Sequence, residues 1–295
     1  MKKSILISLS FLLMLGFGIS VSPTQPADAA GDWYVEPGDS IQSAINDAIA
    51  AGGGTIYFAP GVYEEYCLHI GPPEDYGLPP EHSVEKLELI GSGSSLEDLV
   101  AWIEGTPVSG SVLKASICII SADYPVKVQG FGLFNWNVTN PVGSCITGDN
   151  RYRDGALMVK NSSPTISDCI ISHRGKIRWG GAGMHNENSS PIVSSTVFIF
   201  CCPAHEQIRS RGGAMKNGDS SPVIINSMFL YNDAAHVKPD NSCGGAIHNY
   251  NSNPVLINCV LNGNRAWPYV YPSGTKFAYG GSAIYSVSNS LTTLI

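Results

Sequence analysis

The side chains best suited to chemistry are cationic and aromatic residues that fall between predicted strands in the second half of the chain. The candidate substrate-binding residues are Arg178, Trp179, His205, Arg209, Arg211, His236 and Lys238. An arginine guanidinium forms paired hydrogen bonds with a carboxylate, and the flat face of an aromatic ring can stack on a sugar ring. This combination favours a groove that holds an acidic polysaccharide.

A catalytic site in these loops would need more functional groups than a binding site does. A polysaccharide lyase needs a base that removes the proton beside the substrate carboxylate, and a cation that holds this carboxylate. Arg178, Arg209 or Arg211 could act as the base only if it is desolvated against another charge. Binding requires no cofactor, whereas a lyase would use Ca²⁺ held by carboxylate oxygens. The candidate calcium ligands are Asp149, Asp154, Asp233 and Asp240.

An internal repeat positions these loops. Four segments align without gaps on Pro164, Pro191, Pro222 and Pro254. The residue two positions after each proline is aliphatic, and this column reads Ile166, Val193, Ile224 and Leu256. The residue four positions after each proline is short and polar, and this column reads Asp168, Ser195, Asn226 and Asn258. Columns that keep their character over four units indicate that like residues stack on like.

The repeat unit predicts the fold class. Each unit spans about thirty residues and contains short, β-branched runs such as Val223–Asn226, which are typical of strands rather than helices. Stacked units of this kind form an all-β solenoid, a parallel β-helix, in which each strand pairs with its equivalent in the next coil. Charged side chains fit poorly in the strands of such a coil. Arginines would therefore gather in the loops even if no ligand binds there. Asn226 and Asn258 fit an internal turn ladder better than ligands.

The N-terminal part differs from the repeats. Apolar residues recur at helical spacing from Ile41 to Ile49, and Gly52–Gly54 would end the helix. A short capping helix here would cover the open apolar end of the stack. We therefore expect a β-helix domain over residues 31–295, with an N-terminal cap at 32–63, irregular coils at 64–150 and regular repeats at 151–295.

Two stretches carry a resemblance to a known family. Val35–Ile45 followed by Thr55–Tyr63, and the units beginning at Gly212 and Gly244, resemble bacterial right-handed parallel β-helix repeat proteins of the pectin-lyase-like superfamily. The resemblance covers residues 32–295 and implies a single-stranded right-handed parallel β-helix. It also implies a uronate-containing polysaccharide as the ligand class.

The resemblance does not extend to every activity of that superfamily. The order of Lys176-Ile177-Arg178 is the reverse of the hydrolase motif, and no adjacent aspartate pair is present, so no hydrolase site carries over. Gly212–Met215 with Phe229–Asn232 also resembles the paired motifs of polymorphic outer-membrane adhesins. Two functions therefore remain: a non-catalytic scaffold that is glycan-binding or adhesin-like, and a polysaccharide lyase.

Export is predicted by residues 1–30. Lys2 and Lys3 precede an apolar run over Ile5–Ile19, and Ala27-Asp28-Ala29 is a small-x-small cleavage site, as in a signal peptide. We expect a secreted or cell-surface protein with no membrane span in the mature chain. The net charge of −7 leaves no basic surplus to neutralise phosphates, so we expect no nucleic-acid partner. Eight cysteines make disulfides feasible after export.

The last predicted unit is incomplete. Residues 283–295 match only the first half of a further coil. An uncovered coil exposes strand edges and apolar interior. We therefore expect a truncated repeat, or association with a partner through this end.

Overall fold

The computed structural model describes residues 31–65, 67–135, 155–175, 181–203, 211–234, 243–266, 269–270, 276–277 and 283–295. These residues belong to one compact unit, Gly31–Ile295. The predicted signal peptide lies outside the described residues. Strands dominate the unit, and three long sheets, here called A, B and C, contain most of them.

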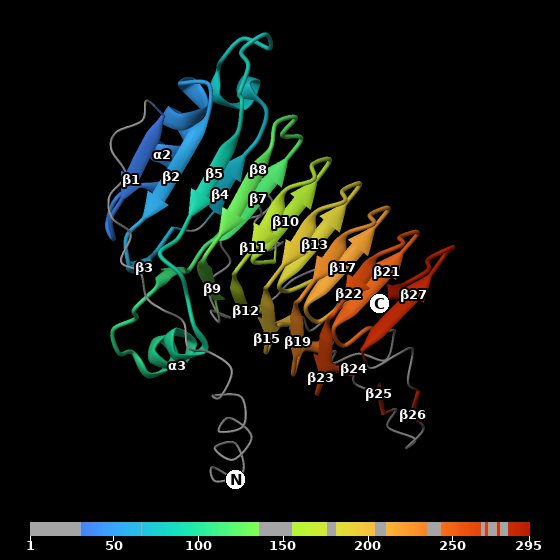
Figure 1. The fold of residues 1–295 in the computed structure, drawn as a ribbon. Helices are drawn as coiled ribbons and strands as arrows, with labels where there is room; N and C mark the ends of the chain where they lie inside the picture. The colour runs from blue at the N-terminus through green and yellow to red at the C-terminus, as the bar shows by residue number, and fades with distance from the viewer. Residues whose placement is uncertain are drawn as a thin grey trace. The chain divides into compact units, whose positions relative to one another are not determined.

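The chain visits the three sheets in turn, and each visit adds one strand (Figure 1). Sheet A contains β1 (Asp32–Val35), β2 (Gly54–Phe58), β5 (Leu87–Ile90), β8 (Val126–Gln129), β11 (Thr165–Ser167), β14 (Ile192–Ser194), β18 (Val223–Ile225), β22 (Val255–Ile257) and β28 (Thr293–Leu294). Sheet B contains β3 (Gly61–Tyr63), β6 (Ser111–Leu113), β9 (Phe131–Asn135), β12 (Ile170–Gly175), β15 (Val197–Ile199), β19 (Met228–Leu230) and β23 (Val260–Asn262). Sheet C contains β4 (Cys67–Ile70), β7 (Ser116–Ile120), β10 (Leu157–Lys160), β13 (Met184–Glu187), β17 (Met215–Gly218), β21 (Ile247–Tyr250) and β27 (Ile284–Val287).

All pairings within these sheets are parallel, and each strand pairs with its equivalent in the next coil. Ile166 lies opposite Val193, Val193 opposite Ile224, and Ile224 opposite Leu256. These four side chains are at most 1% exposed. In sheet B, the rings of Phe198 and Phe229 stack with centroids 4.8 Å apart. The predicted parallel β-helix, with an aliphatic lining, is therefore confirmed.

The predicted turn column has the backbone conformation that a tight bend needs. Asp168, Ser195, Asn226 and Asn258 all have positive φ, between 47° and 53°. Short polar side chains tolerate this left-handed conformation better than branched ones do. The Asn258 side-chain amide donates a hydrogen bond to Asn226 Oδ1 at 2.8 Å, so the expected ladder forms between these two turns.

A second left-handed column follows sheet C, and the sequence analysis missed it. Its members are Asn161, Asn188, Asp219 and Asn251, with φ between 48° and 50°. The chain therefore bends at a left-handed residue on leaving sheet C as well as on leaving sheet A. Short polar residues at both corners allow the strands to remain only three or four residues long.

The N-terminal helix forms over the residues that its spacing indicated. Helix α2 spans Ile41–Ala50, and its buried side chains are Ile41, Ile45, Ala48 and Ile49. It contacts β1, β2 and β4. The N-cap is Ser40, whose side chain accepts from the Ser43 amide, while Glu65 accepts from the Ile41 amide at 2.8 Å. The helix thus begins on side chains that satisfy its first backbone amides.

The region predicted as irregular coils contains elements that the sequence did not reveal. A short 3-10 helix, η2, spans Pro73–Tyr76, and helix α3 spans Leu96–Glu104 between β5 and β6. Ser95 and Asp98 form a capping box at the start of α3. Leu99 and Trp102 pack in a second apolar cluster that includes Val112 and Phe134. Helix α3 therefore covers apolar residues of sheet B outside the main core.

The loops after sheet B begin with ordered strands rather than with irregular chain. Strand β16 (Cys202–Pro203) pairs with the end of β12, and β20 (Asp233–Ala234) pairs with β24 (Arg265–Ala266). Strands β25 (Tyr269–Val270) and β26 (Lys276–Phe277) form an antiparallel pair. The expectation that arginines gather in the loops is wrong for Arg174 and Arg265, which lie within β12 and β24.

The cysteines divide into one bonded residue and several thiols. Cys67 is disulfide-bonded. Cys169, Cys201 and Cys259 are free cysteines. Cys169 is 1% exposed, and burial raises the pKa of its thiol to about 12. Cys169 therefore packs as a small apolar residue.

Helix length also bears on the predicted absence of a membrane span. Within the described ranges, no helix combines the length and the apolar character that crossing a bilayer requires.

Candidate functional site

Of the predicted substrate-binding residues, the structure describes Arg211 alone. Arg178, Trp179, His205, Arg209, His236 and Lys238 lie outside the described residues. Asp149, Asp154 and Asp240, which were candidate calcium ligands, also lie outside them. The fourth candidate ligand, Asp233, forms an ion pair with Arg265 at 3.0 Å. Over the described ranges, no group of three or more His, Cys, Asp or Glu side chains could hold a metal ion.

Sheet C brings together a different set of side chains on its outer face. Residues alternate along each strand, so Leu157, Met184, Met215 and Ile247 enter the core while the next residue in each strand points outward. The register aligns these outward residues across the sheet. We call this line the outer row; it consists of His69, Cys118, Met158, His185, Lys216, His248 and Tyr285.

The centre of the outer row is basic. Lys216 Nζ lies 3.3 Å from His185 Nε2. Arg211 forms an isolated parallel bridge with Cys243 just before these strands, and its charge acts on both Lys216 and His248. We call Arg211, His185, Lys216 and His248 the basic cluster. Three strands of the row, β13, β17 and β21, therefore carry cations and imidazoles in sequence.

Burial changes the protonation of this cluster. Burial, aided by the charge of Arg211, lowers the pKa of Lys216 to about 8, while Glu187 acts in the opposite direction. Burial, followed by Arg211 and Lys216, lowers the pKa of His248 to about 3. Burial and the neighbouring Lys216 and Lys160 also lower the pKa of His185 well below its ordinary value. At neutral pH both imidazoles are therefore uncharged, and the positive charge belongs to Lys216 and Arg211.

The only carboxylate that acts on this cluster among the described residues is already paired. Glu187 Oε1 lies 3.2 Å from Lys160 Nζ, two residue pairs beyond Met158 and His185 along β10 and β13. Among the described residues, Lys160, Lys216 and Arg211 thus place three cationic side chains close to Glu187. A gathering of positive charge of this kind suits an anionic ligand.

Two buried nitrogen atoms in the basic cluster have no hydrogen-bond partner. They are Arg211 Nε and His248 Nδ1. Buried polar atoms without partners are uncommon in proteins, because each costs about 1–3 kcal/mol. Such atoms are found where a ligand or ordered water completes the hydrogen bonding. The arrangement can therefore bind an anion, and Lys216 can also accept a proton once it is neutral.

Sequence reasoning missed His185, Lys216 and His248, although a signal for them was present. Each directly follows a residue of the apolar column Met184, Met215 and Ile247. In a strand, the residue after an inward position points outward. Reading that neighbouring column would have found a row of ionisable residues on one face.

Comparisons with known proteins add little to this picture. No family model and no curated protein matches the chain. Among solved structures, the chain is similar to a pectin methylesterase mutant in complex with a hexasaccharide. The identity is 14%, the TM-score is 0.35, and the match covers 90% of each chain. The strand register of this chain establishes the parallel β-helix independently.

Proposed function

We propose that this protein is an exported β-helix scaffold that binds an acidic polysaccharide along the outer face of sheet C. The observation that carries the proposal is the gathering of cationic side chains in and beside the outer row. Lys160, Lys216 and Arg211 lie on or next to neighbouring strands, with Glu187 as the acidic side chain among them. A polymer with a carboxylate on each sugar ring would meet this charge at successive coils.

The partial burial of the basic cluster strengthens such binding. A charge pair interacts more strongly where water is excluded than at an open surface. Arg211 offers a planar fork that matches a carboxylate, and its Nε is buried without a partner. A bound carboxylate would therefore supply the hydrogen-bond acceptor that this nitrogen lacks.

Two features support an exported protein. Residues 1–30 have the charged start, apolar run and cleavage site of a signal peptide. Cys67 is disulfide-bonded, and structural disulfides persist mainly in oxidising compartments. We therefore place the protein on the cell surface or outside the cell, where acidic polysaccharides are accessible.

Binding can be tested with purified protein on polygalacturonate, alginate and neutral dextran. We expect retention on the two acidic polymers that weakens with salt, and none on dextran. Lys216→Gln and Arg211→Gln should each weaken retention about tenfold or more, because each removes a desolvated charge contact. Lys127→Gln is the matched control, since Lys127 lies on β8 of sheet A. Equal loss in all three variants would indicate general charge attraction and contradict the proposal.

A lyase is the second candidate function, and one observation favours it. Lys216 has a pKa lowered to about 8 and lies 3.3 Å from His185 Nε2, so a fraction of its amine is neutral near physiological pH. A neutral amine can remove the proton beside a uronate carboxylate, and the electron pair then forms a carbon–carbon double bond as the glycosidic oxygen leaves. Arg211 could hold the carboxylate.

Unsaturated product provides a direct assay for this second function. The protein is incubated with polygalacturonate or alginate, with and without Ca²⁺, and the absorbance of the unsaturated sugar is followed. A lyase should gain activity as pH rises through about 8, and Lys216→Gln should abolish the reaction. Polymer binding without product would leave the scaffold function and reject the lyase.

A further inference from the structure

The corner at which the chain leaves sheet B carries residues that its backbone does not favour. Within the described ranges, thirteen residues other than glycine have positive φ, and eleven of them are Ser, Asn or Asp. The other two are Phe200 and Tyr231, with φ of 54° and 53°. They occupy equivalent corners of successive coils, because Ile199 pairs with Leu230 just before them. Bulky side chains are rare in this left-handed conformation, and such outliers cluster at functional sites.

Hydrogen bonds of the backbone and of Asn232 hold this corner in its bend. The Asn232 side chain donates to the Phe198 carbonyl at 3.0 Å and accepts from the Cys201 amide at 3.0 Å. The Tyr231 amide donates to the Asn262 carbonyl at 2.9 Å. None of these bonds uses the Tyr231 side chain, and an asparagine or serine at this position would keep them all. The fold therefore does not require an aromatic residue here.

Phe200, Tyr231 and Gly263 together form a flat surface that we call the aromatic platform. The rings of Phe200 and Tyr231 stack with centroids 5.9 Å apart and planes 23° apart. Phe200 packs against the second apolar cluster, whereas Tyr231 is exposed. The next corner in the column is Gly263, where a Cβ would lie 2.3 Å from Tyr231 Cδ1. Because Gly263 has no side chain, the ring face that turns away from Phe200 is left uncovered.

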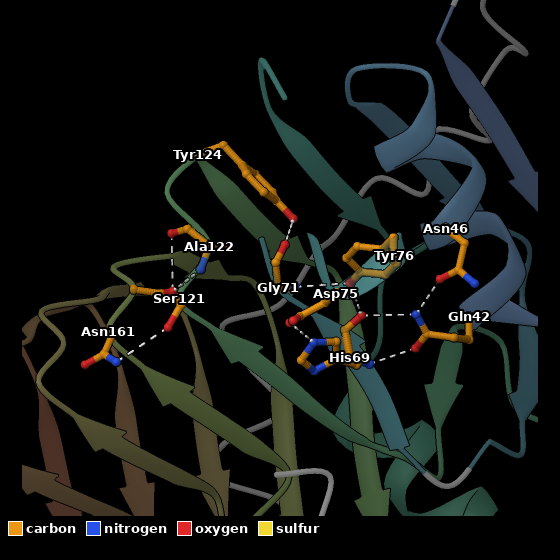
Figure 2. A network of polar contacts seen from close by, with 11 residues as sticks. Gln42, Asn46, His69, Gly71, Asp75, Tyr76, Ser121, Ala122, Tyr124 and Asn161 are labelled. Carbon is orange, nitrogen blue, oxygen red and sulfur yellow. Dashed lines mark hydrogen bonds and ion pairs between the residues drawn. The ribbon is translucent and has the colours of Figure 1, made fainter. Parts of the chain in front are cut away.

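Two tyrosines that stabilise the fold differ from Tyr231. The hydroxyls of Tyr76 and Tyr124 donate to the carbonyls of His69 and Gly71, each at 2.8 Å, as Figure 2 shows. Burial raises the pKa of both hydroxyls above the ordinary value. Tyr231, by contrast, keeps 46% of its surface exposed. Its ring is therefore available to a ligand.

The aromatic platform lies close to the basic cluster. Asp233 follows Tyr231 by two residues, and Gly213 follows Arg211 by two. These two segments touch, because a Cβ at Gly213 would lie 2.7 Å from the Asp233 backbone nitrogen. Asp233 pairs with Arg265, whose side chain is 56% exposed. An exposed ring with charged groups beside it suits a hydrated, ring-shaped ligand better than an apolar protein surface.

We propose that the aromatic platform is a stacking subsite for one pyranose ring of the polysaccharide. The C–H bonds of a sugar ring pack against an aromatic face through dispersion, and the negative face of the ring attracts their hydrogens. The inference rests on the proposed function for the identity of the polymer, and it adds a contact that does not depend on charge. Salt should therefore weaken binding by the basic cluster but not stacking on Tyr231.

Nuclear magnetic resonance of the full chain with labelled tyrosine rings tests the subsite. The protein is titrated with hexagalacturonate and with maltohexaose, a neutral probe. We expect the Tyr231 ring signals, identified by their absence from Tyr231→Phe, to shift with both saccharides. Tyr34 is the matched control, since it is also exposed and stacks on Tyr57 in sheet A with centroids 5.4 Å apart. Its signals should not shift.

Substitutions separate recognition from folding. Tyr231→Asn should weaken hexagalacturonate binding about 5–10-fold at low and high salt alike, whereas Tyr231→Phe keeps the ring and should bind normally. Asparagine suits a left-handed corner, so the Tm of Tyr231→Asn should equal or exceed that of the wild type. Tyr34→Asn places asparagine in a strand, and it should lower the Tm without changing binding.

The outcomes distinguish this subsite from the proposed function. Unshifted Tyr231 signals overturn the subsite, and the proposed function still stands if hexagalacturonate binds and Lys216→Gln weakens it. Tyr231 shifts with maltohexaose keep the subsite, and they reject the acidic ligand if hexagalacturonate binds no more tightly. If Tyr231→Asn binds normally but has a lower Tm, the aromatic corner is structural and the inference is wrong.

Discussion

Strands β13, β17 and β21 carry polar residues on both faces. The polar residues of the inner face and those of the outer face differ in how they are hydrogen-bonded. On the inner face, Asn186 donates to Asn217 at 2.8 Å, and Asn217 donates to Asn249 at 2.7 Å. We call these three residues the inner ladder; all are 0% exposed. On the outer face, the adjacent residues are His185, Lys216 and His248, whose pKa values are all lowered by burial.

This contrast shows how one strand can contribute to both stability and recognition. An asparagine amide has a donor and an acceptor, so identical residues in stacked coils bond to each other without charge. On the outer face, Lys216 Nζ meets His185 Nε2 at 3.3 Å, but Arg211 Nε and His248 Nδ1 have no hydrogen-bond partner. The inner ladder therefore stabilises the fold, whereas the outer row gains most from an external ligand.

The largest expected effect is on the inner ladder. Asn217→Leu removes both amide hydrogen bonds. It leaves the Asn186 donor and the Asn249 acceptor in the core without partners. We expect the free energy of unfolding to fall by about 2–5 kcal/mol, measured by urea denaturation.

Asn186→Leu is the matched control for the ladder. Asn186 Oδ1 already has no partner, so this change removes one hydrogen bond. It leaves one acceptor, Asn217 Oδ1, without a partner. The expected loss is about 1–3 kcal/mol. Equal losses in the two variants would show that the amides do not act as a ladder.

A smaller effect is expected from acid on the outer row. The pKa of His248 is about 3 in the folded protein against 6.5 ordinarily. Between these values the unfolded chain binds a proton that the folded chain does not, so acidification favours unfolding. From pH 7 to pH 4, the wild type should lose about 2 kcal/mol more than His248→Gln in urea denaturation. Parallel pH curves for the two proteins would contradict this prediction.

The smallest effect concerns the buried ammonium group. Below pH 8, Lys216 is charged in both the folded and unfolded states, and the folded state bears the desolvation penalty. Lys216→Met should therefore stabilise the protein by about 1 kcal/mol at pH 7. This stabilisation should shrink between pH 8 and 10.5. In that range Lys216 of the wild type loses its proton in the folded state before it does in the unfolded state, so the free energy of unfolding of the wild type rises. If the stabilisation persists at pH 10.5, it comes from better packing of the methionine and not from removal of the buried charge.

Much of the interior could be predicted because it repeats. Ile166, Val193, Ile224 and Leu256 occupy one column in the sequence and one stack in the structure. The turn column and the helix at Ile41–Ala50 followed from equally local rules, since left-handed corners favour short polar residues and amphipathic helices show their own period.

Features that depend on packing between segments of different sequence could not be predicted from the repeat. Helix α3 has no counterpart in other units, so no column reveals it. Its place over sheet B depends on Leu99 and Trp102 meeting Val112 and Phe134. Arg174 and Arg265 looked like loop residues, because the short strands after sheet B pair only across coils.

The coil, its apolar lining and its corners could be predicted from the amino-acid sequence, because they depend on periodicity and on the backbone preferences of single residues. Which ionisable side chains meet depends instead on the three-dimensional fold. His185, Lys216 and His248 are about thirty residues apart along the chain, and they become neighbours through strand register alone. Their altered protonation follows from burial, which is a property of the stacked coils and not of any one segment.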